Sequence, residues 1–340
     1  MPAGFRSGLV QDTSRTDWDG TGPRPIAWAA WYPASHDAIE APMRVGGSEE
    51  PWFDIGAVAR DAALANSPAA MPVMLASHGT GGTAVSLGWL GRRLARHGIV
   101  MLAANHHGNT AVAPYRPEGF LCWWERARDL TVLLNHVAAE GSLAGRLDLE
   151  RVGAVGFSLG AHAALSLLGG LTDMDRFRAW ADRTGGRLAR DPREFPDLAD
   201  QFPDLMATRS PFRASWERRA LSHRDPRVKA ALLLAPAPPV RAFTDESLAA
   251  IAAPVDMMIG GADVEAPALD GAEWLMERLP QTSIERLGAA VGHFVFLPEA
   301  TEAGRSAASA LCTDAAGVDR RAIHDAAAAA VLSLVDYFVR

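Results

Sequence analysis

The chain has 340 residues, of which 49% are hydrophobic and 21% are charged. This composition is typical of a globular protein and excludes a chain that is disordered or coiled coil throughout. The 33 Lys and Arg residues against 40 Asp and Glu residues give a formal net charge of −7. Because no basic surface is indicated, we expect no nucleic-acid partner. We also expect no membrane span, since no apolar run reaches about 18 residues.

The N-terminal residues and the cysteines bear on the cellular compartment. No apolar segment typical of a signal peptide precedes Thr21, so the sequence predicts a cytoplasmic protein. Cys122 and Cys312 are too few for a disulfide framework or a cysteine-based zinc site. Whether they pair with each other stays open, as does the oligomeric state. His106 and His107 have no carboxylate at metal-ligand spacing, so we expect no metal site.

Short apolar runs alternate with amphipathic stretches along most of the chain. The runs are mostly continuous, as a sheet buried on both faces requires. The pattern therefore predicts an α/β protein with a mostly parallel central sheet and helices on both faces. The expected strands are 26–34, 72–79, 98–106, 151–158, 228–236, 254–261 and 283–290, and the expected helices are 85–98, 123–141, 159–171 and 266–280.

Two segments interrupt this alternation. Residues 39–70 join the first two expected strands, and the pattern predicts a short helix over 51–65. Residues 171–227 are charged, rich in proline and helical in pieces, and are too long for a structureless loop. We expect a single domain over 1–340 with a helical lid insertion over 171–227. Its aromatic residues should mostly form a small core of their own, with one or two touching substrate.

The pentapeptide Gly156-Phe157-Ser158-Leu159-Gly160 has the pattern G-x-S-x-G. Alone this pattern is weak, because Gly and Ser are common residues. Here it follows an expected strand and begins an expected helix, which is the setting of a nucleophile elbow. The flanking glycines allow the tight turn that presents the serine. Ser158 is therefore the candidate nucleophile.

A serine nucleophile needs a general base, and the base needs an acid that orients it. In this architecture the acid and then the histidine follow the serine along the chain. Asp263 lies at the carboxyl end of strand 254–261, where open α/β sheets bind ligands. His293 directly follows the last expected strand. The other histidines after Ser158 fall in expected helices or in the insertion: His162, His223 and His324.

Acyl transfer also needs two N–H donors for the developing oxyanion. One donor should be the N–H of Leu159, the residue after the nucleophile, and the other that of Thr80 in the glycine-rich loop after strand 72–79. His78 in the same loop then shapes the loop without titrating. Trp123 and Trp124 begin a helix and are candidates for substrate contact, although adjacent aromatic residues at a helix start more often pack internally.

Four segments of the sequence resemble a known family. SHGTGGTAVSLGWLGRRLARHGIVMLAANHHGNT is similar to a motif block of dienelactone-hydrolase-like proteins and of platelet-activating-factor acetylhydrolases; GFSLG, GGADVEAP and VGHFVFLP resemble later blocks of the same α/β-hydrolase group. The resemblance implies serine-dependent ester hydrolysis by Ser158, Asp263 and His293. Dienelactone hydrolase itself uses a cysteine. In the acetylhydrolases the acid follows the strand after the elbow helix, but ALLLAPAPP has no carboxylate, which favours Asp263.

The expected function is cleavage of carboxylic esters, including lactones or polyesters, through an acyl-enzyme. The expected partner is a small-molecule ester, and the chemistry needs no cofactor. Amide hydrolysis or acyl transfer by the same triad stays open, because fold and triad exclude neither. A binding protein that has the fold but no turnover is the alternative from another class.

Overall fold

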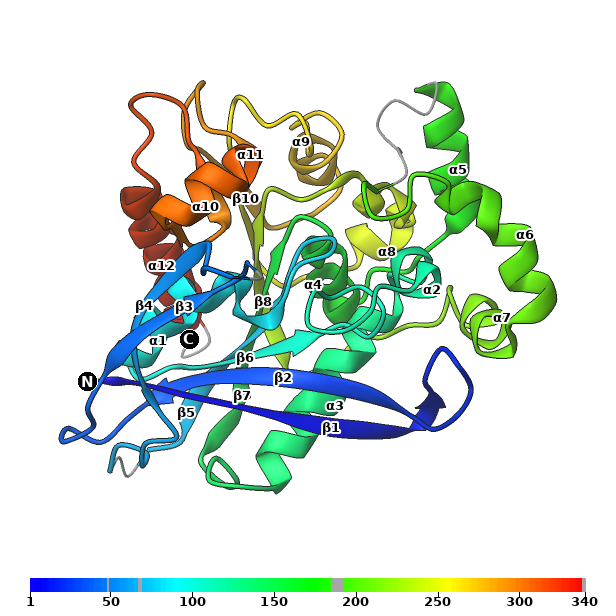
Figure 1. Ribbon diagram of the computed structural model, residues 1–340. Coiled ribbons are helices and arrows are strands. Elements are labelled where there is room, and N and C mark those ends of the chain that lie inside the picture. Colours follow the sequence, from blue (N-terminus) through cyan, green and yellow to red (C-terminus); the bar gives the residue numbers. More distant parts are fainter. Residues whose placement is uncertain (48, 67–68, 185–191, 338–340) are drawn as a thin grey trace.

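The computed structural model describes residues 1–47, 49–66, 69–184 and 192–337 (Figure 1). At its centre lies an 11-stranded sheet of order β10-β9-β8-β7-β5-β6-β2-β1-β4-β11, with β3 paired to β4. The strands are β1 Ala3–Thr16, β2 Pro23–Pro33, β3 Ala41–Val45, β4 Phe53–Arg60, β5 Met71–Ser77, β6 Val100–Asn105, β7 Leu147–Phe157, β8 Val228–Leu234, β9 Val255–Ile259, β10 Thr282–Arg286 and β11 Glu299–Ala300.

The seven expected strands are all present, and the prediction of a mostly parallel sheet is confirmed. Strands β6, β5, β7, β8, β9 and β10 are parallel to one another. Strand β2 is antiparallel to both β6 and β1. All the parallel strands therefore end at one edge of the sheet, and loops after β5, β7 and β9 meet there.

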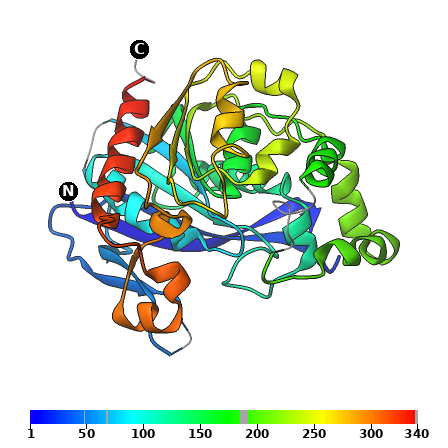
Figure 2. The same cartoon turned by 90° about the horizontal axis from the view of Figure 1, so that it is seen from above.

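Helices cover both faces of the sheet (Figure 2). Helices α3, α4, α8 and α9 bury their apolar side chains in the core on one face, and α1 and α12 do so on the other. The helices are α1 Gly88–Arg96, α2 Pro117–Leu121, α3 Glu125–Ala139, α4 Gly160–Leu168, α5 Met174–Arg183, α6 Leu198–Thr208, α7 Ser210–Glu217, α8 Asp245–Ala249, α9 Ala272–Met276, α10 Glu302–Ala307, α11 Ser309–Cys312 and α12 Arg320–Tyr337, with 3₁₀ turns η1 Ala84–Leu87, η2 Pro238–Ala242 and η3 His293–Phe296.

The helix predicted over 51–65 is wrong, because this stretch forms β4. Ile55 and Val58 are buried in the core beside α1, and both are β-branched residues that favour strands. Gly56 has a φ of +94°, outside the helical region. Pairing with β3, β1 and β11 thus overrides the helical periodicity. The sequence analysis also missed β1, a polar strand whose outward residues are exposed.

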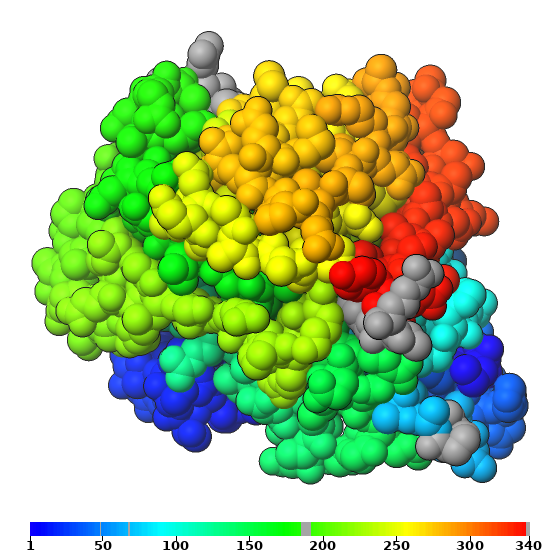
Figure 3. All heavy atoms as spheres, turned by 180° about the vertical axis from the view of Figure 1, so that it is seen from behind, coloured from blue at the N-terminus to red at the C-terminus, as the bar shows by residue number. Residues whose placement is uncertain are grey.

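The insertion over 171–227 contains α5, α6 and α7 and forms one flank of the molecule (Figure 3, green). Residues 185–191 of the insertion lie outside the described part of the chain. Phe202 contacts Phe212 and Trp216 at ring-centroid distances of 5.7 and 4.6 Å. These aromatic residues form a small core together with Trp18 and Trp124. The insertion is therefore anchored to the main body at the β1–β2 turn and the start of α3.

The structure also bears on a disulfide bond and on a membrane-spanning helix. Cys122 and Cys312 are both buried free thiols, so they do not pair. Among the described residues, no helix combines the length and apolarity needed to cross a membrane.

Candidate active site

Ser158 lies at a sharp turn between β7 and α4. Its φ is +53°, in the left-handed region that non-glycine residues rarely adopt. Both flanking glycines are required: a Cβ on Gly156 would collide with the carbonyl of Gly160, and one on Gly160 with that of Ser77. Strain held by the surrounding structure is common at functional sites. The local sequence thus builds the elbow that G-x-S-x-G predicts.

Asp263 and His293 lie in contact on the neighbouring loops. Asp263 follows β9, and His293 begins η3 after β10. His293 Nδ1 lies 2.7 Å from Asp263 Oδ2, and both side chains are buried. The other carboxylate oxygen, Oδ1, accepts hydrogen bonds from the backbone N–H groups of Glu265 and Ala266 at 3.0 and 2.7 Å. Since these bonds fix the carboxylate, it fixes the imidazole orientation in turn.

The histidine lies beside the elbow. The imidazole of His293 is 5.0 Å, between ring centroids, from the ring of Phe157, the residue before the serine. Ser158 is 8% exposed, so most of the serine is covered by protein. Within the described residues, Ser158 Oγ makes no hydrogen bond. Such bonds are often long in ligand-free sites and shorten when substrate binds.

The two expected oxyanion donors face no acceptor. Among the described residues, neither the N–H of Thr80 nor that of Leu159 donates a hydrogen bond. Leu159 caps α4 directly after the serine. The loop of Thr80 approaches the elbow closely, since a Cβ on Gly79 would lie 3.2 Å from Ser158 Cβ. Both N–H groups are therefore free to bind an oxyanion.

A buried polar network supports the loop that carries Thr80. His78 Nδ1 donates to the carbonyl of Gly79 at 2.7 Å, and Arg126 Nη1 donates to the carbonyl of His78 at 2.6 Å. Burial, together with Arg126 and His106 nearby, lowers the pKa of His78 well below its ordinary value. His78 is therefore neutral and shapes the loop, as the sequence analysis expected.

His106 links this network to a buried carboxylate. Its Nδ1 lies 3.0 Å from Asp129 Oδ2, and its Nε2 lies 2.9 Å from Ser77 Oγ. Burial would raise the pKa of Asp129, but Arg24 and Arg15 beside it hold that pKa well below its ordinary value. Burial lowers the pKa of His106 to about 4. Neutral His106 thus donates to ionised Asp129 and accepts from the Ser77 hydroxyl.

The turn that carries His293 is held by side chains from α1 and α12, which pack in the same core as Val295 and Phe296. Trp89 Nε1 donates to the carbonyl of Phe296 at 2.8 Å. His324 Nε2 bonds the carbonyl of Val295 at 2.9 Å, and its ring stacks on Trp89 with centroids 3.7 Å apart. Burial lowers the pKa of His324 to about 3, so its Nε2–H is the donor of a neutral ring. His324 therefore connects α12 to the turn that carries His293.

The two tryptophans proposed for substrate contact lie in different surroundings. Trp123 is partly exposed and contacts His162 of α4 and Phe177 of the insertion at 6.1 and 4.8 Å between centroids. Trp124 is fully buried, and its Nε1 donates to Ser215 Oγ at 3.1 Å. Trp124 thus anchors α7 to α3, whereas Trp123 faces the first turn of α4, the helix that follows Ser158.

Residues 192–197 of the insertion reach both sides of the site. Arg193 forms an ion pair with Glu265, two residues beyond the acid, at 3.1 Å. On the other side, a Cβ on Gly81 would lie 2.5 Å from Glu194 Oε1, which places Glu194 against the loop of Thr80. Phe195 contacts Phe120 at 5.0 Å between centroids. We call residues 192–197 the crossing segment.

No metal cluster accompanies the site: within the described ranges, His, Cys, Asp and Glu nowhere gather in groups of three that could hold a metal ion.

Comparison with known proteins identifies the architecture. A structure titled ferulic acid esterase from Streptomyces cinnamoneus superposes on 99% of this chain and 89% of its own, with a TM-score of 0.61 and 18% identity. Together with the strand order, the antiparallel β2 and the strained serine after β7, this likeness decides the fold. The chain has the α/β-hydrolase fold.

Sequence comparison gives shorter matches to α/β-hydrolases. Cutinase 1 of Thermobifida cellulosilytica is 32% identical over 93 residues, 27% of this chain and 32% of the relative. The cutinase of Thermobifida fusca (strain YX) is 32% identical and cutinase est1 of Thermobifida alba 34% identical, each over 28% of its length. The matched part thus spans about a third of these relatives. No family model matches the chain. The narrower resemblance to dienelactone hydrolases stays a prediction.

The residues that support the candidate site were not found from the sequence. A signal for some of them existed, because Glu125, Arg126 and Asp129 place charges on the apolar face of α3 and are buried there. Charged residues at buried helical positions indicate a paired network. No local pattern indicates that Trp89 and His324 would meet behind His293.

Proposed function

We propose that the protein is a serine hydrolase of carboxylic esters. The observation that carries the proposal is the buried pair of His293 Nδ1 and Asp263 Oδ2, 2.7 Å apart, beside a serine held at a φ of +53°. The names of the relatives, cutinase and ferulic acid esterase, support an ester substrate.

The mechanism follows from the geometry. Asp263 holds Nδ1–H of His293, so the Nε2 lone pair takes the Ser158 proton as Oγ attacks the acyl carbon. The N–H groups of Thr80 and Leu159 receive the oxyanion. The His293 imidazolium then protonates the leaving alcohol, and water hydrolyses the acyl-enzyme with the same base. The proposed steps use groups of this chain and one water molecule, and they need no cofactor.

The insertion over 171–227 acts as a lid in this proposal. The crossing segment contacts the acid loop through Arg193 and the oxyanion loop through Glu194, so it bounds the route to Ser158. Partly exposed aromatic residues flank this route: Tyr115, Trp123, Phe177 and Phe195. Such a wall suits esters with an aromatic or bulky acyl group, including lactones and polyesters, and limits water near the oxyanion. Fully buried Trp124 is not part of this wall.

A fluorophosphonate probe tests the proposal directly. It should label Ser158, identified by peptide mass, and labelling should abolish hydrolysis of p-nitrophenyl esters in the same sample. Parallel assays with matched amides and with alcohol acceptors separate esterase from amidase and acyltransferase. An unlabelled Ser158 in folded protein without turnover of any ester would favour the binding-protein alternative.

A further inference from the structure

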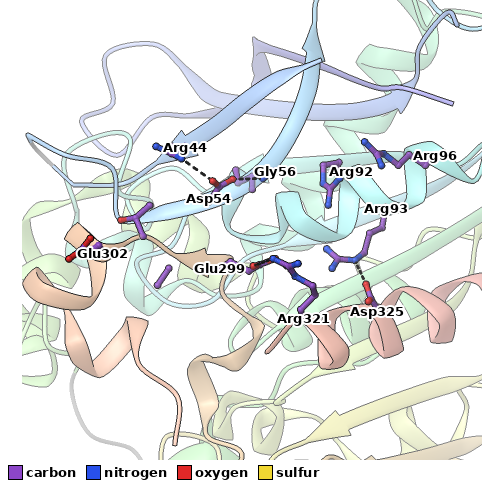
Figure 4. A pocket seen from close by; sticks show the side chains of 13 residues that line it. Arg44, Asp54, Gly56, Arg92, Arg93, Arg96, Glu299, Glu302, Arg321 and Asp325 are labelled. Atoms are coloured by element: carbon purple, nitrogen blue, oxygen red, sulfur yellow. Dashed lines mark hydrogen bonds and ion pairs between the residues drawn. The ribbon is translucent and has the colours of Figure 1, made fainter. Parts of the chain in front are cut away.

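A groove with no role in the proposed chemistry lies between α1, β4 and α12 (Figure 4). Its volume is about 840 Å³. It contains none of Ser158, Asp263 and His293, so any ligand there is distinct from the ester. Ile55, Gly56 and Ala300 are among its lining residues, most of which are charged.

Most arginines of the groove are neutralised by a carboxylate. Each pair joins two different elements: β3 with β4, α1 with α12, α12 with β11, and α1 with the residue before β3. They are Arg44–Asp54 at 3.2 Å, Arg93–Asp325 at 2.7 Å, Arg321–Glu299 at 2.6 Å and Arg96–Glu40 at 2.6 Å.

Arg92 is the exception. Within the described part of the chain its guanidinium has no ion pair, and its Nε is buried without a hydrogen-bond partner. Burial, with Arg96 and Arg93 one turn away or less, lowers the pKa of Arg92. Glu40 and Glu299 attract it through space, yet each is already held by another arginine. A partly buried cation without a counter-ion is costly to the folded protein.

We propose that the groove binds the oxyanion group, a carboxylate or a phosphate, of a small molecule at Arg92. A guanidinium presents paired N–H donors that match the two oxygens of such a group. Nε of Arg92 is buried, so the ligand would bind the terminal Nη1 and Nη2 groups, for which the described residues provide no hydrogen-bond or ion-pair partner. The Arg92 side chain packs closely over Gly56, since a Cβ on Gly56 would lie 2.5 Å from its Nε. Only glycine at position 56 leaves room for the guanidinium in this place.

The remaining charges restrict the ligand to a small one. Asp54, Glu299, Glu302 and Asp325 line the groove beside its five arginines, leaving a single net positive charge. Glu302 lies at the end of the groove away from Arg92 (Figure 4). A polyanion such as nucleic acid would meet these carboxylates along its length, whereas a ligand with one anionic group meets only Arg92.

Titration calorimetry with sodium phosphate and with sodium benzoate tests the proposal on the full chain. Arg92→Gln removes the unpaired charge, and Arg286→Gln, an exposed arginine on β10 outside the groove, is the matched control. We expect saturable binding of at least one anion to wild type and Arg286→Gln, weakened about tenfold or more in Arg92→Gln. Binding of phosphate alone or benzoate alone assigns the oxyanion.

Absence of saturable binding up to about 10 mM, or equal binding by Arg92→Gln, overturns the proposal. The latter result would place the anion elsewhere, for example as a product at Ser158. Thermal unfolding gives an independent measurement, because a ligand that binds only the folded state raises Tm. The bound anion should raise the Tm of wild type but not of Arg92→Gln, which without ligand should unfold at the wild-type temperature or above it. Neither measurement depends on ester turnover.

Discussion

Ser158 combines a strained backbone with a reactive position, and the two can be separated by substitution. Ser158→Ala keeps the turn and its strain, so the free energy of unfolding should change little. Loss of the nucleophile should lower kcat by about 10⁴- to 10⁶-fold. Ser166→Ala, a buried serine on the same elbow helix, is the control. Near-normal turnover of p-nitrophenyl butyrate by folded Ser158→Ala would contradict the assignment.

The acid can be assigned by comparing two aspartates of the β9 region. Asp263→Asn keeps the shape but favours the wrong imidazole tautomer of His293, so kcat should fall about 10⁴-fold. Asp256→Asn removes a carboxylate whose Oδ1 accepts a hydrogen bond from Ser283 Oγ at 2.6 Å. Within the described residues it bonds to none of the candidate site residues, so the rate should stay near wild type. Steady-state kinetics on one ester would decide, and the reverse ranking would place the acid elsewhere.

The residues of the candidate triad could be predicted because each follows a strand in a recognisable pattern. The elbow needs glycine on both sides of Ser158, and Asp263 and His293 lie in the loops after β9 and β10. The supporting residues could not be predicted, because Asp129 acquires its arginine partners from β1 and β2, more than 100 positions earlier. Only the three-dimensional pairing makes that buried carboxylate stable.

At the scale of elements, η3 depends on α1 and α12 for its position. We expect His324→Leu to lower kcat about tenfold or more with little change in KM, because a small displacement of His293 slows the chemistry without removing substrate contacts. His324→Gln keeps an N–H donor for the Val295 carbonyl and should restore much of the rate. If the two variants have equal Tm values but unequal kcat, His324 positions the turn of His293. If both variants lose kcat and Tm in parallel, His324 contributes packing alone.

The crossing segment allows a sharper test of the lid than deletion of the insertion, which would uncover Trp124 and the aromatic core around it. Phe195→Ala removes the contact with Phe120 beside the site. It should change the ratio of kcat/KM between short and bulky esters while leaving phosphonate labelling of Ser158 nearly unchanged. Phe202→Ala, inside the insertion core, is the control. An unchanged ratio in folded Phe195→Ala would place the insertion away from substrate.

Elements were predicted best where one strand or helix carries its own periodicity. Continuous apolar runs such as 228–236 predict buried strands directly from their own residues. Strand β4 was misread because Gly56 and Ala57 dilute its alternation and its pairing partners come from β1, β3 and β11. Edge structure of this kind is set by neighbours rather than by its own residues.

At the scale of the whole molecule, buried histidines make stability depend on pH. Burial lowers the pKa of His106 and His107 to about 4, and that of His162 and His324 to about 3. The unfolded chain binds these protons near pH 6.5, whereas the folded chain does not. The contribution of these histidines to the free energy of unfolding is therefore fully present above about pH 6.5. It falls on acidification by about 1.4 kcal/mol per pH unit for each histidine.

Urea unfolding between about pH 7.5 and pH 5 measures this loss. His107 Nε2 accepts from the backbone N–H of Trp18, a bond that glutamine can replace without taking up a proton. His107→Gln should therefore reduce the slope by about one histidine's share. His97→Gln, exposed at the end of α1, should leave the slope as in wild type. Identical slopes in all three proteins would contradict this account.

The stacking of His324 on Trp89 also has a consequence for biosynthesis. A ribosome releases the elbow with Ser158 first, then the loops of Asp263 and His293, and only later the helix that fixes the turn of η3. More than 200 residues are synthesised between Trp89 and its stacking partner His324. The groups needed for ester cleavage are therefore present on the nascent chain before they are aligned. If the proposed function holds, a nascent chain should cleave esters more slowly than the folded protein until α12 packs against Trp89.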